Sequence, residues 1–181
     1  MTLDSAAIIS FWFHEIESKM WFQKNDQFDA LVTQKFSHIV KKSAACELWG
    51  WRSTPHGRLA EILILDQFSR NIFRGKPSSF AQDTLALVLA QEAVCLGIDS
   101  ELSTAEKSFL YMPFMHSESL SVHTEAVRHF AKPGLESGLD FELRHKAIIE
   151  RFGRYPHRNA ILGRVSTVAE IEFLKEAGSS F

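Results

Sequence analysis

The densest group of side chains with chemical potential in this sequence is the stretch ERFGRYPHRNAILGR, residues 150–164. Four arginines and one histidine fall within it, although the formal net charge of the chain is −2. Aromatic and aliphatic residues are interspersed among the charges, so the stretch does not resemble a basic tail kept disordered by self-repulsion. We therefore expect a negative group beside these guanidinium groups.

The backbone pattern around Pro156 also predicts an anion site. Gly153 should end the preceding helix, and Pro156 suits the first position of a short new helix. His157, Arg158 and Asn159 would then occupy its first turn. A helix N-terminus is already electropositive, so each cation there loses about 0.3–1 kcal/mol unless a negative group offsets it.

The negative group is either part of the chain or part of a ligand. An internal partner would be a carboxylate, and the cluster would then stabilise packing; the candidates are Asp66, Asp83, Glu118 and Glu150. An external partner would be a phosphate or carboxylate, and the cluster would then bind a small anionic molecule or an acidic peptide group. For that alternative we expect these binding residues: Asp66, Arg70, Asn71, Arg151, Arg154, His157, Arg158 and Asn159.

A second polar group lies in the apolar segment LDQFSRNIFRG, residues 65–75. Asp66 and Arg70 stand four positions apart, which is the spacing of an intrahelical ion pair. The simplest interpretation is an internal pair that fixes a helix end. The alternative is that both side chains contribute to the anion site.

A third group is His116 with Glu118, just after Pro113. The structural interpretation is that Glu118 or Ser117 caps the next helix. The functional interpretation makes His116 an acid or base near neutral pH and Glu118 the carboxylate that orients it.

The sequence gives no support to metal, cofactor or nucleic-acid chemistry. The eight histidines form no HxxxH or HExxH face, and no phosphate-binding glycine loop or GxSxG motif is present. We predict no metal site and no cofactor. A net charge of −2 also offers no general attraction to nucleic acid or to acidic membranes.

Two further observations bear on location. Cys46 and Cys95 are isolated, which is typical of free thiols in a cytoplasmic protein. The apolar run SAAIISFWF near the start is too short to span a bilayer and lacks the basic residues of a secretion signal. We therefore expect a cytoplasmic protein.

Helical periodicity runs along the chain. Apolar residues at three- and four-residue steps, together with capping signals, predict helices at residues 26–44, 54–68, 79–97, 103–113, 118–131, 139–152 and 167–178. Capping boxes are predicted at Ser79 with Gln82, at Ser103 with Glu106 and at Thr167 with Glu170. Pro113 should kink or end its helix.

No segment shows strand-like alternation, and no linker divides the chain. A length of 181 residues suits one domain, and 45% hydrophobic residues suffice for a core. The short connections favour antiparallel neighbours. We predict an all-α fold of stacked helical hairpins in a single domain, residues 1–181, although no 34-residue repeat is readable.

The segments LILDQFSRNIFRG, FLYMPFMHSE and ERFGRYPHRNAILGR resemble the signature blocks of the bacterial domain-of-unknown-function family DUF924. The resemblance extends to FWF near the start, to Trp21 with Phe22, to Phe80 with Asp83 and to STVAEIEFL near the end, so it covers nearly the whole chain. Ser69 stands where the family commonly has proline. The resemblance implies a tetratricopeptide-like helical fold and implies no activity.

Three functional hypotheses follow. The first is a helical module that binds an anionic small molecule or acidic peptide group. The second is a hydrolase or transferase on an anionic phosphate or carboxylate substrate, with His116 as acid or base. The third is a scaffold that binds a protein partner or a second copy of the chain, in which the charged blocks are structural.

Overall fold

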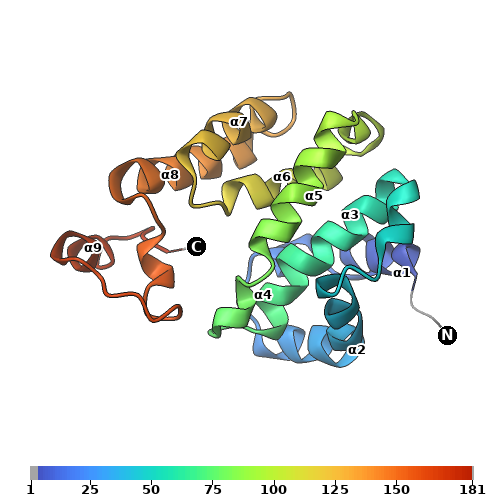
Figure 1. The fold of residues 1–181 in the computed structure, drawn as a ribbon, viewed down its shortest axis with the longest axis horizontal. Helices are drawn as coiled ribbons and strands as arrows, with labels where there is room; N and C mark the ends of the chain where they lie inside the picture. The colour runs from blue at the N-terminus through green and yellow to red at the C-terminus, as the bar shows by residue number, and fades with distance from the viewer. Residues whose placement is uncertain (1–3, 181) are drawn as a thin grey trace.

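The computed structural model of the protein describes residues 4–180. Over these residues the regular secondary structure is helical and no strand is present (Figure 1), which confirms the predicted all-α fold class. The α-helices are α1 (Ser5–Ser10), α2 (Asp26–Ala44), α3 (Pro55–Leu63), α4 (Ser69–Ile72), α5 (Asp83–Cys95), α6 (Thr104–Met115), α7 (Leu120–Phe130), α8 (Glu136–Phe152) and α9 (Val168–Phe173).

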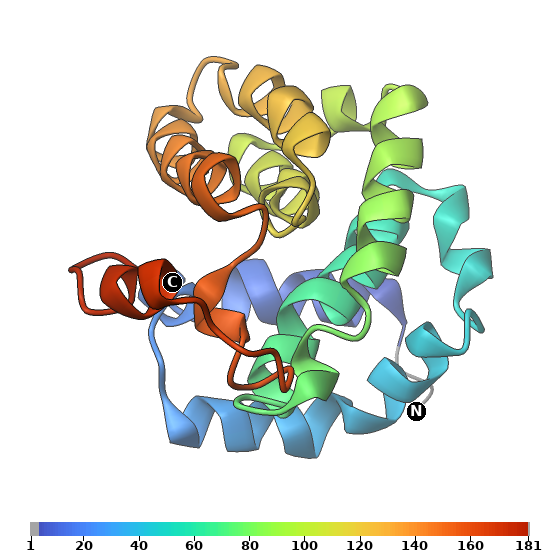
Figure 2. The same cartoon turned by 60° about the vertical axis from the view of Figure 1, so that its left-hand side comes forward.

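The helices pack in two ways. From α5 onward each helix packs against the next, as α5 does on α6, α6 on α7 and α7 on α8. In the N-terminal part the main contacts instead join α1 to α3 and α2 to α4. The segment after α8 turns back from the α7–α8 pair towards the start of α5 (Figure 2). This return places Arg158 beside Asp83, whereas α9 lies at the edge of the molecule (Figure 1).

The helix that begins at Pro55 is interrupted by a wider, π-helical turn at Ile64–Phe68 and continues as α4. Thr54 caps it by accepting a hydrogen bond from the Gly57 N–H, as its position before proline predicts. The turn is fully enclosed and includes Asp66 and Gln67. Single π-helical turns occur frequently at functional positions, because the extra residue redirects the side chains around it.

The hydrophobic core has two parts. The larger part is centred on aromatic rings, where Trp12 lies 5.4 Å from Phe68 and 5.6 Å from Phe109, measured between ring centroids. The smaller part joins α8 to the C-terminal segment and contains Ile148, Ile149, Tyr155 and Phe173. The structure therefore anchors the C-terminal segment by its own apolar contacts. That residues 1–181 form one domain stays a prediction.

The local capping predictions succeed where the side chain has no other partner. The boxes at Ser103 with Glu106 and at Thr167 with Glu170 are both formed. The predicted box at Ser79 is wrong, because the Ser79 hydroxyl donates to the Lys76 carbonyl at 2.7 Å. Helix α5 consequently begins at Asp83 with no side-chain cap.

Three other details differ from expectation. The helix containing Pro113 does not end at the proline but continues to Met115. The last helix stops at Phe173 rather than near Gly178. Phe141, one of the apolar residues of the predicted helix 139–152, is 48% exposed.

Gly57 provides a test of packing at the start of α3. A Cβ atom there would lie 1.9 Å from the Trp51 carbonyl oxygen. We expect Gly57→Ala to lower the free energy of unfolding by about 1–3 kcal/mol, because the neighbouring backbone must move. Gly50→Ala is the matched control, since nothing lies within 4 Å of its Cβ position. Urea unfolding of both variants checks this, and equal stabilities for the two would contradict it.

Candidate functional site

The centre of the candidate site is the carboxylate of Asp66, which is only 1% exposed. It accepts hydrogen bonds from His116 Nδ1 at 2.7 Å and from Gln67 Nε2 at 2.6 Å, and Arg70 Nη1 lies 3.2 Å away. Burial alone would raise the pKa of Asp66, but the charge of Arg70 and the hydrogen bond from His116 outweigh it and hold the pKa below its usual value. Asp66 is therefore ionised inside the protein.

An ionised carboxylate only accepts hydrogen bonds, so His116 Nδ1 must be the donor towards Asp66. Burial, followed by the charge of Arg70, lowers the pKa of His116 below its usual value. The imidazole is consequently neutral at pH 7, and its Nε2 carries a lone pair. Asp66 thus fixes both the orientation and the tautomer of His116.

Two arginines share the carboxylate of Asp83 at the first turn of α5. Arg70 Nη2 donates to Asp83 Oδ2 at 3.0 Å, and Arg158 Nη1 donates to the same oxygen at 3.1 Å. Arg70 also donates to the Asp66 carbonyl at 2.7 Å. This arrangement joins the π-helical turn, α5 and the loop after α8 through one carboxylate.

Arg158 is less well compensated than Arg70. Its guanidinium lies between the rings of Phe80 and Tyr155, at 4.6 and 4.7 Å from their centroids, and it is only 6% exposed. Its Nε–H has no acceptor among the described residues. Burial, followed by the like charge of Arg70, lowers the pKa of Arg158, despite the attraction of Asp83.

His116 and Arg158 line the same pocket, whose volume is about 300 Å³. The remaining lining residues are Pro77, Phe80, Ala81, Asp83, Thr84, Leu87, Ser117, Glu118 and Leu162. One part of the wall is therefore charged and another apolar. A pocket with these walls can hold a small molecule that has a polar end and an apolar body.

The role expected of Glu118 differs from its observed contacts. Glu118 Oε1 accepts from the Tyr155 backbone N–H at 2.7 Å and from Arg164 Nη2 at 2.9 Å, while Oε2 accepts from Arg164 Nη1 at 2.7 Å. The carboxylate that orients His116 is Asp66, not Glu118. Glu118 instead ties the segment after α6 to the loop after α8.

Other expected binding residues are committed to contacts within the chain. Arg154 forms two hydrogen bonds with Glu170, at 2.6 and 2.8 Å, and so anchors α9. Asn159 accepts from Arg164 Nε at 2.9 Å and donates to Ser166 at 3.0 Å. These two side chains connect segments of the protein and do not line the pocket.

Arg151 lies on the surface, with its side chain 52% exposed and its guanidinium over the rings of Phe152 and Phe173. Glu150, expected as a possible internal partner, pairs with Lys146 instead. Of the four arginines in residues 150–164, Arg158 therefore lines the pocket and Arg151 lies on the surface. Arg154 and Arg164 form ion pairs within the protein.

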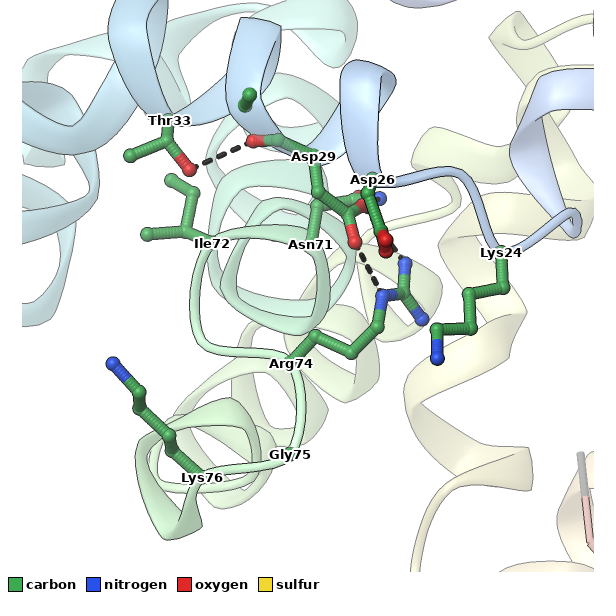
Figure 3. A pocket seen from close by; sticks show the side chains of 10 residues that line it. Lys24, Asp26, Asp29, Thr33, Asn71, Ile72, Arg74, Gly75 and Lys76 are labelled. Atoms are coloured by element: carbon green, nitrogen blue, oxygen red, sulfur yellow. Dashed lines mark hydrogen bonds and ion pairs between the residues drawn. The ribbon is translucent and has the colours of Figure 1, made fainter.

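Asn71 points to a different pocket, of about 400 Å³, between α2 and α4 (Figure 3). Its Nδ2 donates to Asp29 Oδ1 at 2.8 Å, and Arg74 pairs with the same carboxylate. Lys24, Asp26 and Asp29 approach from the start of α2 (Figure 3). The structure therefore does not bring Asn71 together with Arg158.

A buried polar layer, not foreseen as a unit, lies around Tyr155. The Tyr155 hydroxyl donates to the Met115 carbonyl at 2.5 Å, and His123 Nδ1 lies 2.7 Å from Glu142 Oε1 with both side chains fully buried. His145 and His157 have rings 5.7 and 5.4 Å from the Tyr155 ring. The signal in the sequence was weak, since these residues come from three separate elements.

Residues 4–180 contain neither a disulfide nor a cluster of side chains of the kind that holds a metal ion. No group of three or more histidine, cysteine, aspartate or glutamate side chains there could hold a metal ion. Both cysteines are free and exposed. Among the helices of the same residues, none has the length and apolar character needed to cross a membrane.

Comparison with known proteins identifies a family and a solved structure that are similar over nearly the whole chain. The profile of the family described as bacterial protein of unknown function, DUF924, matches residues 8–178. The solved structure of the protein of unknown function ATU0120 from Agrobacterium tumefaciens is similar, with a TM-score of 0.91 and 37% sequence identity. The match covers 96% of this chain and 97% of that one. No curated protein matches the sequence.

The buried histidines predict acid sensitivity. Burial lowers the pKa of His145 to about 3 and that of His157 to about 4, from a usual value of 6.5. Below pH 6.5 the unfolded chain therefore binds more protons than the folded one, and stability falls as pH decreases. Above pH 6.5 both histidines are neutral in the folded and in the unfolded chain, so the folded protein no longer loses stability through them. Each such proton can add up to about 1.4 kcal/mol per pH unit to the slope of the free energy of unfolding against pH.

Urea unfolding between pH 5 and 7 measures that slope in a range where most carboxylates stay ionised. We expect His145→Gln to reduce the slope, whatever its effect on stability at pH 7. His38→Gln, on the exposed side of α2, is the control and should leave the slope unchanged. A wild-type stability that does not change from pH 7 to pH 5 would contradict the prediction.

Proposed function

The chain belongs to the bacterial family of unknown function DUF924, and we propose that it is a helical binding module for a small anionic molecule. The proposed site is the pocket of about 300 Å³ lined by the start of α5, by His116–Glu118 and by Arg158 with Leu162. A binding role needs only that the pocket be preformed and that its polar wall be complementary to the ligand.

The observation that carries the proposal is the state of Arg158. Its guanidinium is nine-tenths buried, shares its single carboxylate partner with Arg70 and has an Nε–H without an acceptor. A buried cation with so few contacts is under-compensated, because both desolvation and the neighbouring Arg70 oppose its charge. A phosphate or carboxylate group in the pocket would give this guanidinium a hydrogen-bond acceptor that it does not share with Arg70.

His116, which lines the same pocket as Arg158, supports the same proposal. Its Nδ1 is bound to Asp66, so Nε2 is the nitrogen available to a ligand. A bound anion would favour the protonated imidazole, which then donates from Nε2. Anion binding at this site would therefore be accompanied by proton uptake near neutral pH.

Thermal unfolding in the presence of phosphate, sulfate, nucleotides or short carboxylates tests the proposal. A bound anion at about 100 times its Kd should add about 2.7 kcal/mol of stability. Each kcal/mol should raise Tm by about 2–4 °C for a chain of this length. Arg158→Gln should abolish the shift. Arg154→Gln, which alters the same loop outside the pocket lining, should retain it.

The proposal fails if no anion stabilises the folded protein, or if Arg158→Gln responds as the wild type does. The comparison of the two glutamine variants matters because both remove an internal ion pair. Lower stability of both without ligand is expected. Only the response to the anion separates a binding arginine from a structural one.

A second function, acid–base catalysis, is favoured by one observation. The hydrogen bond of 2.7 Å between Asp66 and His116 Nδ1 leaves the lone pair of Nε2 unused by Asp66, on a residue that lines the pocket. In a hydrolase or transferase on a phosphate or carboxylate substrate, Nε2 would take the proton from the attacking nucleophile. Arg158 would stabilise the negative charge that develops.

Hydrolysis of p-nitrophenyl phosphate and p-nitrophenyl acetate tests the catalytic function. His116→Gln should reduce turnover by about 10²–10⁴-fold, because general-base catalysis contributes that much. His38→Gln, far from the pocket lining on the surface of α2, is the control. Activity that survives in His116→Gln would assign the reaction to another group, and no turnover of either substrate by the wild type would argue for binding alone.

A further inference from the structure

We infer that the ligand of this pocket is zwitterionic, carrying an ammonium group beside its anionic group on a short apolar body, as an aliphatic α-amino acid does. The inference rests on the proposed function and adds a second charge to the ligand. It comes from the acidic side chains that line the same pocket as Arg158 and His116.

The first argument is the balance of charge around the pocket. Three guanidinium groups and three carboxylates interact there, with His116 neutral; they are Arg70, Arg158, Arg164, Asp66, Asp83 and Glu118. The fixed charges therefore sum to zero. A simple anion would leave the occupied site negative unless His116 took up a proton, whereas a zwitterion leaves the balance unchanged.

The second argument is the placement of Glu118. It lines the pocket, and its side chain is 28% exposed. Although burial alone would raise the pKa of Glu118, hydrogen bonds from Arg164 and from the Tyr155 backbone lower it, so the carboxylate is ionised at neutral pH. An anion without a positive group would enter a pocket that already presents this negative charge.

Glu118 also retains the capacity to bind an ammonium group. Its Oε1 accepts two hydrogen bonds, from Tyr155 and Arg164, but Oε2 accepts only one, from Arg164. A carboxylate oxygen can accept two hydrogen bonds. Oε2 therefore has one acceptor position left for an N–H group, which the ligand ammonium would fill while its carboxylate meets Arg158.

The third argument is the apolar wall. Pro77, Phe80, Leu87 and Leu162 line the pocket together with the charged residues. A volume of about 300 Å³ lies at the small end of ligand pockets. The pocket thus suits a short aliphatic side chain attached directly to the two charged groups, rather than a nucleotide or a peptide.

A series of leucine analogues with one apolar body tests the inference by isothermal titration calorimetry. L-Leucine carries both charges, 4-methylpentanoate lacks the ammonium group, and leucinamide lacks the carboxylate. We expect wild-type protein to bind leucine at least 10-fold more tightly than either analogue. Titration in buffers of different ionisation enthalpy should show proton uptake with 4-methylpentanoate and none with leucine.

Two variants assign the contacts. Glu118→Gln should weaken leucine binding at least 10-fold and leave 4-methylpentanoate binding unchanged or tighter. Arg158→Gln should weaken both ligands. Glu125→Gln is the matched control, since Glu125 pairs with Arg128 on the surface of α7. The analogue series with wild-type protein keeps the inference testable if Glu118→Gln fails to fold.

Equal affinity for leucine and 4-methylpentanoate would overturn the zwitterion inference and leave the anion-binding proposal intact. The same holds if phosphate or another simple anion stabilises the protein while leucine does not bind. If neither simple anions nor leucine bind, both the proposed function and this inference are wrong.

Discussion

The fold is organised around one buried negative charge, the carboxylate of Asp66. An isolated ionised carboxylate inside a protein is costly, so it requires both a cation and hydrogen-bond donors at close range. Arg70, His116 and Gln67 meet that requirement from three directions. The π-helical turn Ile64–Phe68 makes this possible, since it places Asp66 on the enclosed side of the helix while Arg70 can still reach both it and Asp83. Removing Asp66 would leave Arg70, His116 and Gln67 without this buried partner.

The arginines of this arrangement differ in how fully their charges are satisfied within the protein. Arg154 and Arg164 each form paired hydrogen bonds with one carboxylate, a geometry that satisfies a guanidinium within the protein. Arg158 differs because it shares Asp83 with Arg70 and lies enclosed between two aromatic rings beside an open pocket. In the proposed function, stability and binding therefore depend on different members of one arginine-rich stretch. Under-compensation of Arg158 links the buried network to the pocket.

Local rules in the sequence were sufficient for most of the fold and for part of the site. The predicted signals that succeeded each act within a few residues of the chain. They are the capping boxes, Pro55 after Thr54, and Gly153, which has a left-handed φ of 68°. The partners of the charged side chains were harder, since His116 lies 50 residues from Asp66 and Arg158 lies 75 residues from Asp83. Glu118, two residues from His116, was the obvious neighbour in sequence, but the fold turns it towards Arg164 instead. Spacing predicts a contact only within one element, and these contacts join several.

The central claim is that Asp66 holds His116 as a neutral ring with its proton on Nδ1. Long-range ¹H–¹⁵N NMR of the histidine side chains measures both the tautomer and the pKa, with His116→Gln identifying the signal. At pH 7 the account predicts a neutral ring protonated on Nδ1, with a pKa below the usual 6.5. A doubly protonated ring at pH 7, or a neutral ring with its proton on Nε2, would contradict it.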